Sequence, residues 1–262
     1  MKGKSAIVTG STQGIGEAIS RKLIANGLSN LIICGRNNDR GEMLADEFSR
    51  SGCNTIYVQS DLSKINDCNK IIDVANKSFK TIDILVNSAG TTDRGTLIDT
   101  TPELFDKIFA INVRAPFFLM SGVVKTMISK NNSGSILNII SMSSHGGQPK
   151  LSAYSSSKGA LAILTKNAAF AYMRDNIRIN GLNIGWSNTP GEHRIQKEND
   201  KAPDNWLIEA VKDQPMGRLI EPKEIAEVSD FILSDKSGMM TGVIIDYDQS
   251  VHGANYTPPR PE

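Results

Sequence analysis

The chain has 262 residues, of which 29 are lysine or arginine and 28 are aspartate or glutamate, so its net charge is +1. This near-neutral balance argues against a dedicated nucleic-acid-binding protein, which carries a surplus of basic residues. Because 39% of the residues are apolar, a chain of this length can bury a substantial core, and a largely disordered protein is excluded.

Short apolar runs rich in β-branched residues alternate with longer segments of helical periodicity. The predicted strands are 6–8, 31–33, 55–58, 82–86, 135–140, 177–180 and 243–245. The predicted helices cover 14–26, 39–50, 65–79, 102–130 and 153–173, and a further helix opens at 221–222. Pro116 lies inside the fourth helix and predicts a kink or a break there. This alternation is typical of a parallel sheet covered on both faces, so we expect an α/β fold of the doubly wound Rossmann type with about seven strands.

No linker, internal repeat or change of composition divides the chain, so residues 1–262 are expected to form a single domain. Three prolines near the end predict an irregular, exposed tail from about residue 255. The apolar run at 5–8 is too short for the core of a signal peptide, and the strongly apolar stretch 115–124 is too short to cross a membrane. We therefore expect a cytoplasmic protein with no membrane partner.

Cysteine and histidine usage argues against disulfides and metals. The three cysteines are odd in number and form no CxxC pair, so neither a disulfide framework nor a cysteine zinc site is expected. The three histidines lack the spacing of a metal site, and we predict no metal. These residues are Cys34, Cys53, Cys68, His145, His193 and His252.

A glycine-rich loop follows the first predicted strand, with the sequence TGSTQGIG at residues 9–16. Gly10 permits a tight turn, Gly14 lets the backbone approach a pyrophosphate, and Gly16 lets the next helix pack closely on the strand. The start of that helix offers amide donors and a partial positive charge to an anion. The loop therefore predicts a dinucleotide site, and the alternative is a tight strand-to-helix turn without a ligand.

The end of the second predicted strand indicates which dinucleotide is bound. NAD-preferring sites place an acidic residue there, but this chain has Gly35 and Arg36 instead. A guanidinium suits a 2′-phosphate, because it donates two parallel hydrogen bonds. NADP is therefore favoured over NAD, unless Arg36 is simply a solvated surface residue.

Tyr154 and Lys158 lie four residues apart at the start of a predicted helix, so their side chains share one face. A free phenol has a pKa near ~10 and is a poor base at neutral pH. An adjacent ammonium group lowers the pKa of the phenol, and Tyr154 could then exchange a proton with an alcohol or carbonyl oxygen. A YxxxK pair by itself is common by chance, but Ser141 ends the fifth predicted strand 13 residues earlier.

Taken with these residues, nearly the whole chain resembles the short-chain dehydrogenase/reductase family. The glycine loop resembles its TGxxxGxG motif, and residues 87–90 (NSAG) resemble its NNAG motif with Ser88 in place of the second asparagine. Asp61 and Leu62 stand where the family contacts adenine. The resemblance also covers residues 178–180 and Gly185. Its catalytic tetrad is matched in order and spacing by Asn112, Ser141, Tyr154 and Lys158.

The resemblance implies a role for each residue. Tyr154 is the general acid/base, Lys158 bonds the nicotinamide ribose, and Ser141 polarises the substrate oxygen. Asn112 orders a water that links Lys158 to solvent, and Thr189 meets the nicotinamide carboxamide. The implied cofactor contacts are Gly10, Ser11, Thr12, Gln13, Gly14, Ile15, Gly16, Arg36, Asp61, Leu62, Asn87, Ala89, Gly90, Tyr154, Lys158, Gly185 and Thr189. A homotetramer is also implied.

Three positions depart from the family pattern. Ile184 replaces the proline before Gly185, and Asp248-Gln249-Ser250 replaces the usual DGG. Gln13 stands where many NADP-preferring members have a basic residue, which leaves Arg36 alone to meet the phosphate.

The predicted activity is NAD(P)-dependent hydride transfer between a nicotinamide cofactor and a secondary alcohol or ketone. In the family, the segment after the sixth strand forms a substrate lid, here at about 187–215. Its charged residues favour a small polar substrate such as a sugar, sugar acid or polyol, with Ser141, His145, Gln148 and Trp186 as candidate contacts. The alternative substrate is a 3-oxoacyl thioester. A catalytically inactive, cofactor-binding regulator is the alternative from another class.

Overall fold

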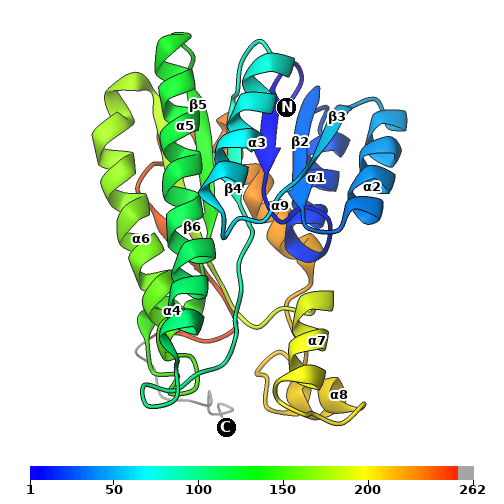
Figure 1. Cartoon of the computed structure of the whole chain (residues 1–262), viewed down its shortest axis with the longest axis vertical. Coiled ribbons are helices and arrows are strands. Elements are labelled where there is room, and N and C mark those ends of the chain that lie inside the picture. Colours follow the sequence, from blue (N-terminus) through cyan, green and yellow to red (C-terminus); the bar gives the residue numbers. More distant parts are fainter. Residues whose placement is uncertain (253–262) are drawn as a thin grey trace, which may run out of the picture.

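The computed structural model describes residues 1–252. The irregular tail predicted from about residue 255 lies outside these residues. The described part contains a seven-stranded parallel sheet with the order β3-β2-β1-β4-β5-β6-β7 (Figure 1). The strands are β1 (Ser5–Val8), β2 (Asn30–Gly35), β3 (Asn54–Gln59), β4 (Ile84–Asn87), β5 (Gly134–Ile139), β6 (Ile177–Ile184) and β7 (Ile244–Tyr247). The predicted doubly wound fold of about seven parallel strands is confirmed.

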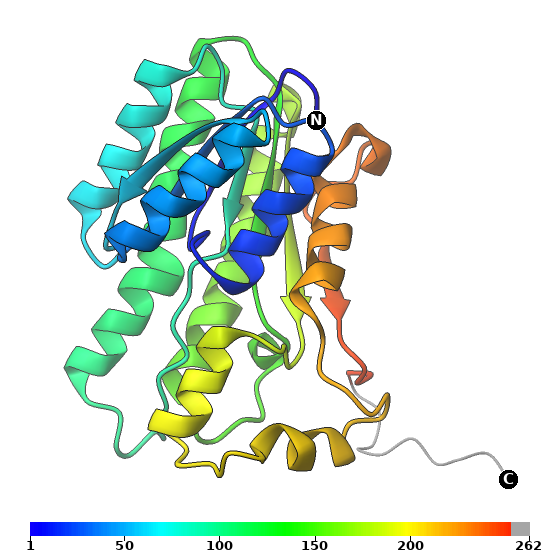
Figure 2. The same cartoon turned by 90° about the vertical axis from the view of Figure 1, so that its right-hand side faces the viewer.

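Helices cover both faces of the sheet, as Figure 2 shows from the side. Their bounds are α1 (Gly14–Ala25), α2 (Asn38–Arg50), α3 (Ile65–Ser78), α4 (Pro102–Phe109), α5 (Ala115–Ser129), α6 (Ser152–Tyr172), α7 (Pro190–Glu198), α8 (Trp206–Lys212) and α9 (Pro222–Leu233). Neighbouring residues of β1 point to opposite faces: Ala6 and Val8 pack with α1, α2 and α9, whereas Ile7 packs with α3, α5 and α6. Both faces are thus buried, which explains why the strands read as continuous apolar runs.

The helix around Pro116 differs from the prediction. Helix α4 passes into one π-helical turn, η1 (Ala110–Arg114), and α5 follows with Pro116 in its first turn. The irregular turn therefore precedes the proline. Pro116 has no N–H to donate to the carbonyl of Asn112, and a π-turn at this point accommodates that missing bond.

The helical segment that contains Pro116 is longer than the apolar stretch 115–124 considered in the sequence. By length and mean hydropathy, 1.4 over an 18-residue window, the helical run Pro102–Ser129 could cross a membrane. The sequence estimate stopped at the charges that flank 115–124 and was therefore too short. In the fold, half of that window is buried, and α5 packs against α3 and the sheet.

Two short helices, α7 and α8, extend beyond the carboxyl ends of the strands (Figures 1 and 2). They occupy most of the segment predicted to be a lid. No residue of α7 is buried, and Trp206 is the buried residue of α8. This segment therefore stands apart from the core and faces the strand ends that carry the candidate site.

Candidate active site

A cavity of about 2260 Å³ lies at the carboxyl ends of the strands, where α/β sheets bind their ligands. Its wall includes the glycine loop, the ends of β2, β4, β5 and β6, the start of α6, and α7. It exceeds the usual volume of a small-molecule site, roughly 300–1,000 Å³, and has room for a dinucleotide together with a substrate.

The glycine loop has the geometry that its sequence predicts. Gly10 adopts φ +61° and Gly14 adopts φ +60°, a region that favours glycine. A Cβ at Gly10 would lie 2.8 Å from the Cα of Ala89, and one at Gly16 would lie 2.5 Å from the carbonyl oxygen of Gly10. The side chain of Gln13, the residue before α1, does not cap the helix. The first backbone amides of α1 therefore face the cavity without a capping side chain. These features fit a pyrophosphate group.

Two of the expected cofactor contacts, Ser11 and Asn87, do not line this cavity. The Ser11 hydroxyl donates to the carbonyl of Val8 at 2.7 Å and accepts from the amide of Cys34 at 3.0 Å. Asn87 donates to the amide oxygen of Asn138 at 2.8 Å. Both side chains are buried and join neighbouring strands just behind the cavity wall.

The opposite end of the loop borders the position predicted for the adenosine group. A Cβ at Gly35 would lie 2.6 Å from the Thr12 hydroxyl, so the glycine lets the two segments meet. Arg36 is exposed and lines the cavity. The Asp61 carboxylate accepts from the Ser63 hydroxyl at 2.8 Å, which lowers the pKa of Asp61, and the charge of Arg36 lowers it further.

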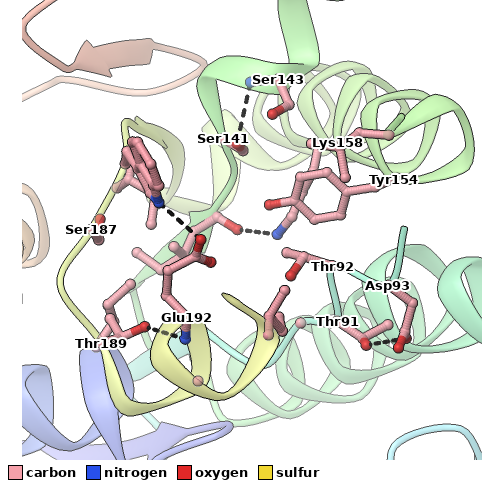
Figure 3. A pocket seen from close by; sticks show the side chains of 18 of the residues that line it. Thr91, Thr92, Asp93, Ser141, Ser143, Tyr154, Lys158, Ser187, Thr189 and Glu192 are labelled. Carbon is pink, nitrogen blue, oxygen red and sulfur yellow. Dashed lines mark hydrogen bonds between the residues drawn. The ribbon is translucent and has the colours of Figure 1, made fainter. Parts of the chain in front are cut away.

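The four residues of the predicted tetrad come from three elements. Tyr154 and Lys158 lie in the first two turns of α6, and Ser141 follows β5 directly. These three side chains converge on one wall of the cavity (Figure 3). All are at most 8% exposed, and the Lys158 ammonium donates to the carbonyl of Ile139 at 2.9 Å.

Burial is the largest cause of the pKa shifts of Tyr154 and Lys158. It raises the pKa of Tyr154 to about 12, although a hydrogen bond from Ser141 and the charge of Arg94 oppose this rise. It lowers the pKa of Lys158 to about 8. For the phenol, removal from water outweighs the groups that stabilise its charged form, and the expectation that Lys158 lowers the pKa of Tyr154 stays a prediction.

Asn112 lies behind these residues in the π-turn and is fully buried. Its amide oxygen accepts from the N–H of Thr91 at 2.9 Å, and its NH₂ group donates to the Thr91 carbonyl and the Ser157 hydroxyl, each at 3.0 Å. A Cβ at Gly90 would lie 3.4 Å from that amide oxygen and 3.5 Å from the Lys158 ammonium. A Cβ at this position would be in ordinary contact with both groups, so Gly90 lies beside both Asn112 and Lys158.

The candidate substrate contacts also border the cavity, and two of them already form hydrogen bonds. His145 lies 3.1 Å from both carboxylate oxygens of Asp246. Gln148 accepts from the Ser143 hydroxyl at 2.5 Å. These two residues shape the wall of the cavity, and a ligand would have to compete for their hydrogen bonds.

Sequence reasoning missed Arg94. This residue lies on the loop after β4, lines the cavity, and holds Asp200, in the segment predicted to be a lid, through its Nε and Nη2 atoms at 2.8–3.3 Å. Its Nη2 atom is also 3.8 Å from Glu192 of α7. The sequence did indicate that Arg94 lies near the site, because it follows the NSAG segment by four residues at the carboxyl end of a strand. Its partner Asp200 could not be predicted, because it lies 106 residues away.

A nucleotide-sized cavity with a glycine-lined helix start beside a buried Tyr–Lys–Ser group defines a nicotinamide-dependent oxidoreductase. The family model of the short chain dehydrogenase matches residues 4–200, and the chain belongs to this family. It is therefore an oxidoreductase that acts on CH–OH groups with a nicotinamide cofactor.

Three relatives illustrate the range of this family. The NADP-dependent (R)-specific alcohol dehydrogenase of Lentilactobacillus kefiri is 34% identical over 245 residues, covering 92% of this chain and 94% of the relative. The structure of a gluconate 5-dehydrogenase from Burkholderia cenocepacia J2315 with NADP and tartrate has a TM-score of 0.86 and 27% identity, covering 97% of each chain. That of a 3-ketoacyl-(acyl-carrier-protein) reductase from Brucella melitensis with NADH has a TM-score of 0.82 and 29% identity, covering 95% of this chain and 98% of the reductase.

Proposed function

We propose that Tyr154 is the general acid/base of this oxidoreductase and that Ser141, Lys158 and Asn112 assist it. The observation that carries the proposal is the convergence of Ser141, Tyr154 and Lys158 on one wall of the cavity that the glycine loop opens (Figure 3). When bound, the nicotinamide supplies the hydride acceptor or donor. The chain supplies the proton transfer and the orientation of the substrate.

Each side chain acts at a stated atom. In the oxidation direction, the Tyr154 phenolate accepts the hydroxyl proton of the substrate, while the Ser141 hydroxyl holds the same oxygen. Lys158 is buried against the Ile139 carbonyl, which places its charge beside the phenol. Asn112 fixes the loop after β4 against α6 through Thr91 and Ser157. Its role in the proposal is to order a water that links Lys158 to solvent.

For the cofactor, we infer a preference for NADP over NAD. Arg36 lines the adenosine end of the cavity, and the tip of β2 carries no carboxylate. Charge-assisted hydrogen bonds contribute roughly 1.5–3 kcal/mol. Arg36→Ala should therefore raise the KM for NADP about 10- to 100-fold and leave the KM for NAD nearly unchanged. Equal losses with both cofactors would show that Arg36 does not contact the phosphate.

For the substrate, we propose a small polar secondary alcohol or ketone of the sugar, sugar acid or polyol class. Support comes from the lid helix α7, which has no buried residue and places Glu192, Arg194 and Glu198 on the cavity wall. An aliphatic chain would need an apolar wall, at about 25 cal/mol per Å² of buried area. A gluconate 5-dehydrogenase and a 3-ketoacyl reductase both resemble this chain, so a 3-oxoacyl thioester is the second candidate.

A panel of polyols, sugar acids, 3-oxoacyl thioesters and long aliphatic ketones, assayed with both cofactors, separates these substrates. We expect the highest kcat/KM with a polyhydroxy compound. A clear preference for acyl thioesters would replace this substrate class by the second candidate. Absence of turnover throughout, with NADP still bound, would favour the inactive cofactor-binding regulator.

We also propose that the chain forms a homo-oligomer, a tetramer by resemblance to the family, and that it works in the cytoplasm. Support for assembly comes from exposed apolar residues on the helices α4, α5 and α6. These three helices lie at the same side of the molecule in Figure 1. The exposed apolar residues are Phe105, Phe117, Phe118, Ile163 and Phe170. Light scattering on the purified chain should give four times the monomer mass, and a monomer would refute the assembly. The three free, buried cysteines agree with a reducing compartment, which cell fractionation can test.

A further inference from the structure

Glu192 occupies a position in the cavity that the proposed chemistry does not explain. It projects from α7 into the cavity, opposite the wall that carries Tyr154 (Figure 3). Its side chain is 15% exposed, which is low for a carboxylate outside the core. Its negative charge also acts on the phenol and raises the pKa of Tyr154. A carboxylate at this place must therefore influence which substrates can approach the tyrosine.

Hydrogen bonds hold this carboxylate in a fixed orientation. The indole N–H of Trp186 and the side-chain amide of Gln196 both donate to its Oε1 atom at 2.8 Å. The amide N–H of Glu192 itself donates to the Thr189 hydroxyl at 3.1 Å. Within residues 1–252, no hydrogen bond is formed to the Oε2 atom. One carboxylate oxygen is thus anchored, and the other is left to accept a hydrogen bond from a ligand.

The cationic side chain beside it is already neutralised. Arg94 holds Asp200 by three contacts of 2.8–3.3 Å and lies 3.8 Å from Glu192. A carboxylate on the substrate would have to displace Asp200 from Arg94 and to approach the charge of Glu192. Of the other cations on the cavity wall, Lys107 is paired with Asp93 at 3.0 Å, and Lys158 belongs to the proposed catalytic group. The remaining ones are exposed and hence screened by solvent; they are Arg36, Lys150 and Arg194.

We propose that Glu192 binds a hydroxyl group of the substrate through Oε2 and repels carboxylates, so that the substrate is a neutral polyol or sugar and not a sugar acid. A hydroxyl donates to the carboxylate without adding charge, whereas a carboxylate can only accept. This inference rests on the proposed function, and within the substrate class proposed there it separates neutral polyols and sugars from sugar acids.

The test compares D-glucitol with D-gluconate, which differ at one carbon: a CH₂OH group in the first is a carboxylate in the second. Their dissociation constants are measured by calorimetry on the NADP⁺ complex of the wild type and of three variants. Glu192→Gln keeps an acceptor for Trp186 and removes the charge, and Glu192→Ala removes both. Glu198→Gln is the matched control, because Glu198 also lines the cavity from α7 but is exposed.

We expect the wild type to bind D-glucitol at least tenfold more tightly than D-gluconate. Glu192→Gln should reduce this ratio at least fivefold, mainly through tighter binding of D-gluconate, and Glu192→Ala should weaken D-glucitol at least tenfold. The control should change the ratio less than twofold, and NADP⁺ affinity should stay within threefold in all variants.

Equal or tighter binding of D-gluconate by the wild type would overturn the inference, as would binding of neither compound. A ratio unaffected by Glu192→Gln would also refute it. Turnover of butan-2-ol is measured in parallel: if it is present while these results fail, the substrate inference is wrong and the oxidoreductase site stands. If no secondary alcohol or ketone is turned over, the proposed function itself fails.

Discussion

The cavity has two walls that are built in different ways. On the sheet side, the glycine loop and the strand ends are packed so closely that a Cβ at Gly16 would lie 2.5 Å from a backbone oxygen. On the lid side, α7 has no buried residue, and the segment that follows it is held by polar contacts, among them the Arg94–Asp200 pair. Close packing tolerates little change, whereas ion pairs between partly exposed side chains contribute about 0–1 kcal/mol each and are easily exchanged.

The difference suggests a division of labour between the two walls. The sheet wall fixes the positions of Ser141, Tyr154 and Lys158, so it sets the chemistry. The lid wall presents Glu192 and Arg194, whose charges can differ between relatives without disturbing the core, so it selects the substrate. Substitutions in the first wall should therefore affect turnover of every substrate, and those in the second should affect discrimination between substrates.

The largest effect is expected from Tyr154→Phe, which removes one hydroxyl from the sheet wall. General acid–base catalysis contributes about 10²–10⁴-fold, so kcat should fall by that factor for every substrate. The ring and its packing remain, and the affinity for NADP should stay within threefold. Steady-state kinetics and a cofactor titration measure both quantities. A kcat within threefold of the wild type would remove Tyr154 from the mechanism.

Lys158→Met should lower the activity of the protein and raise its stability. Burial lowers the pKa of Lys158 from 10.5 to about 8, so the unfolded chain binds this proton more tightly than the folded chain does. The resulting loss of unfolding free energy is fully present below pH 8 and disappears as the pH rises from about 8 to 10.5. After subtraction of the lost bond to Ile139, the variant should gain about 1–3 kcal/mol of unfolding free energy at pH 7 and lose turnover.

Denaturant unfolding of the ligand-free chain, followed at pH 7 and pH 10, measures this gain. The advantage of the variant should shrink at the higher pH. A variant that is less stable than the wild type at pH 7 would show that burial of the lysine is compensated elsewhere in the fold.

The smallest effect is expected on the pH dependence of oxidation. The charge of Glu192 raises the pKa of Tyr154 and the charge of Arg94 lowers it. The acidic limb of kcat for butan-2-ol should therefore move to lower pH in Glu192→Gln and to higher pH in Arg94→Met. Shifts of the same sign in both variants would mean that Glu192 and Arg94 act on the phenol through its packing and not through their charges.

Much of the sheet wall could be predicted from the sequence, because its signals are local. The apolar runs of the strands, the glycine spacing and the four-residue interval between Tyr154 and Lys158 each lie within one element or one turn. The direction of side chains at strand ends was harder to predict: Ser11 and Asn87 turn into the wall and bond to Val8 and Asn138.

The lid wall could not be predicted in the same way, because its contacts join distant segments. Arg94 and Asp200 are 106 residues apart, and no periodicity links them. The sequence showed a charged segment but not which of its charges would face the cavity and which would face solvent. The rise in the pKa of Tyr154 was also missed, since it depends on burial by several elements at once.

The most direct test of the division of labour is to break the lid pair without touching the sheet wall. Asp200→Asn removes the charge that neutralises Arg94 and leaves the glycine loop and the tetrad unchanged. In calorimetry, the affinity for NADP⁺ should stay within threefold, whereas the ratio of D-gluconate to D-glucitol affinity should rise at least fivefold, because Arg94 can then bind a carboxylate. A ratio that is unchanged, or a loss of NADP⁺ affinity that parallels the change in the ratio, would contradict a lid that selects the substrate without altering the cofactor site.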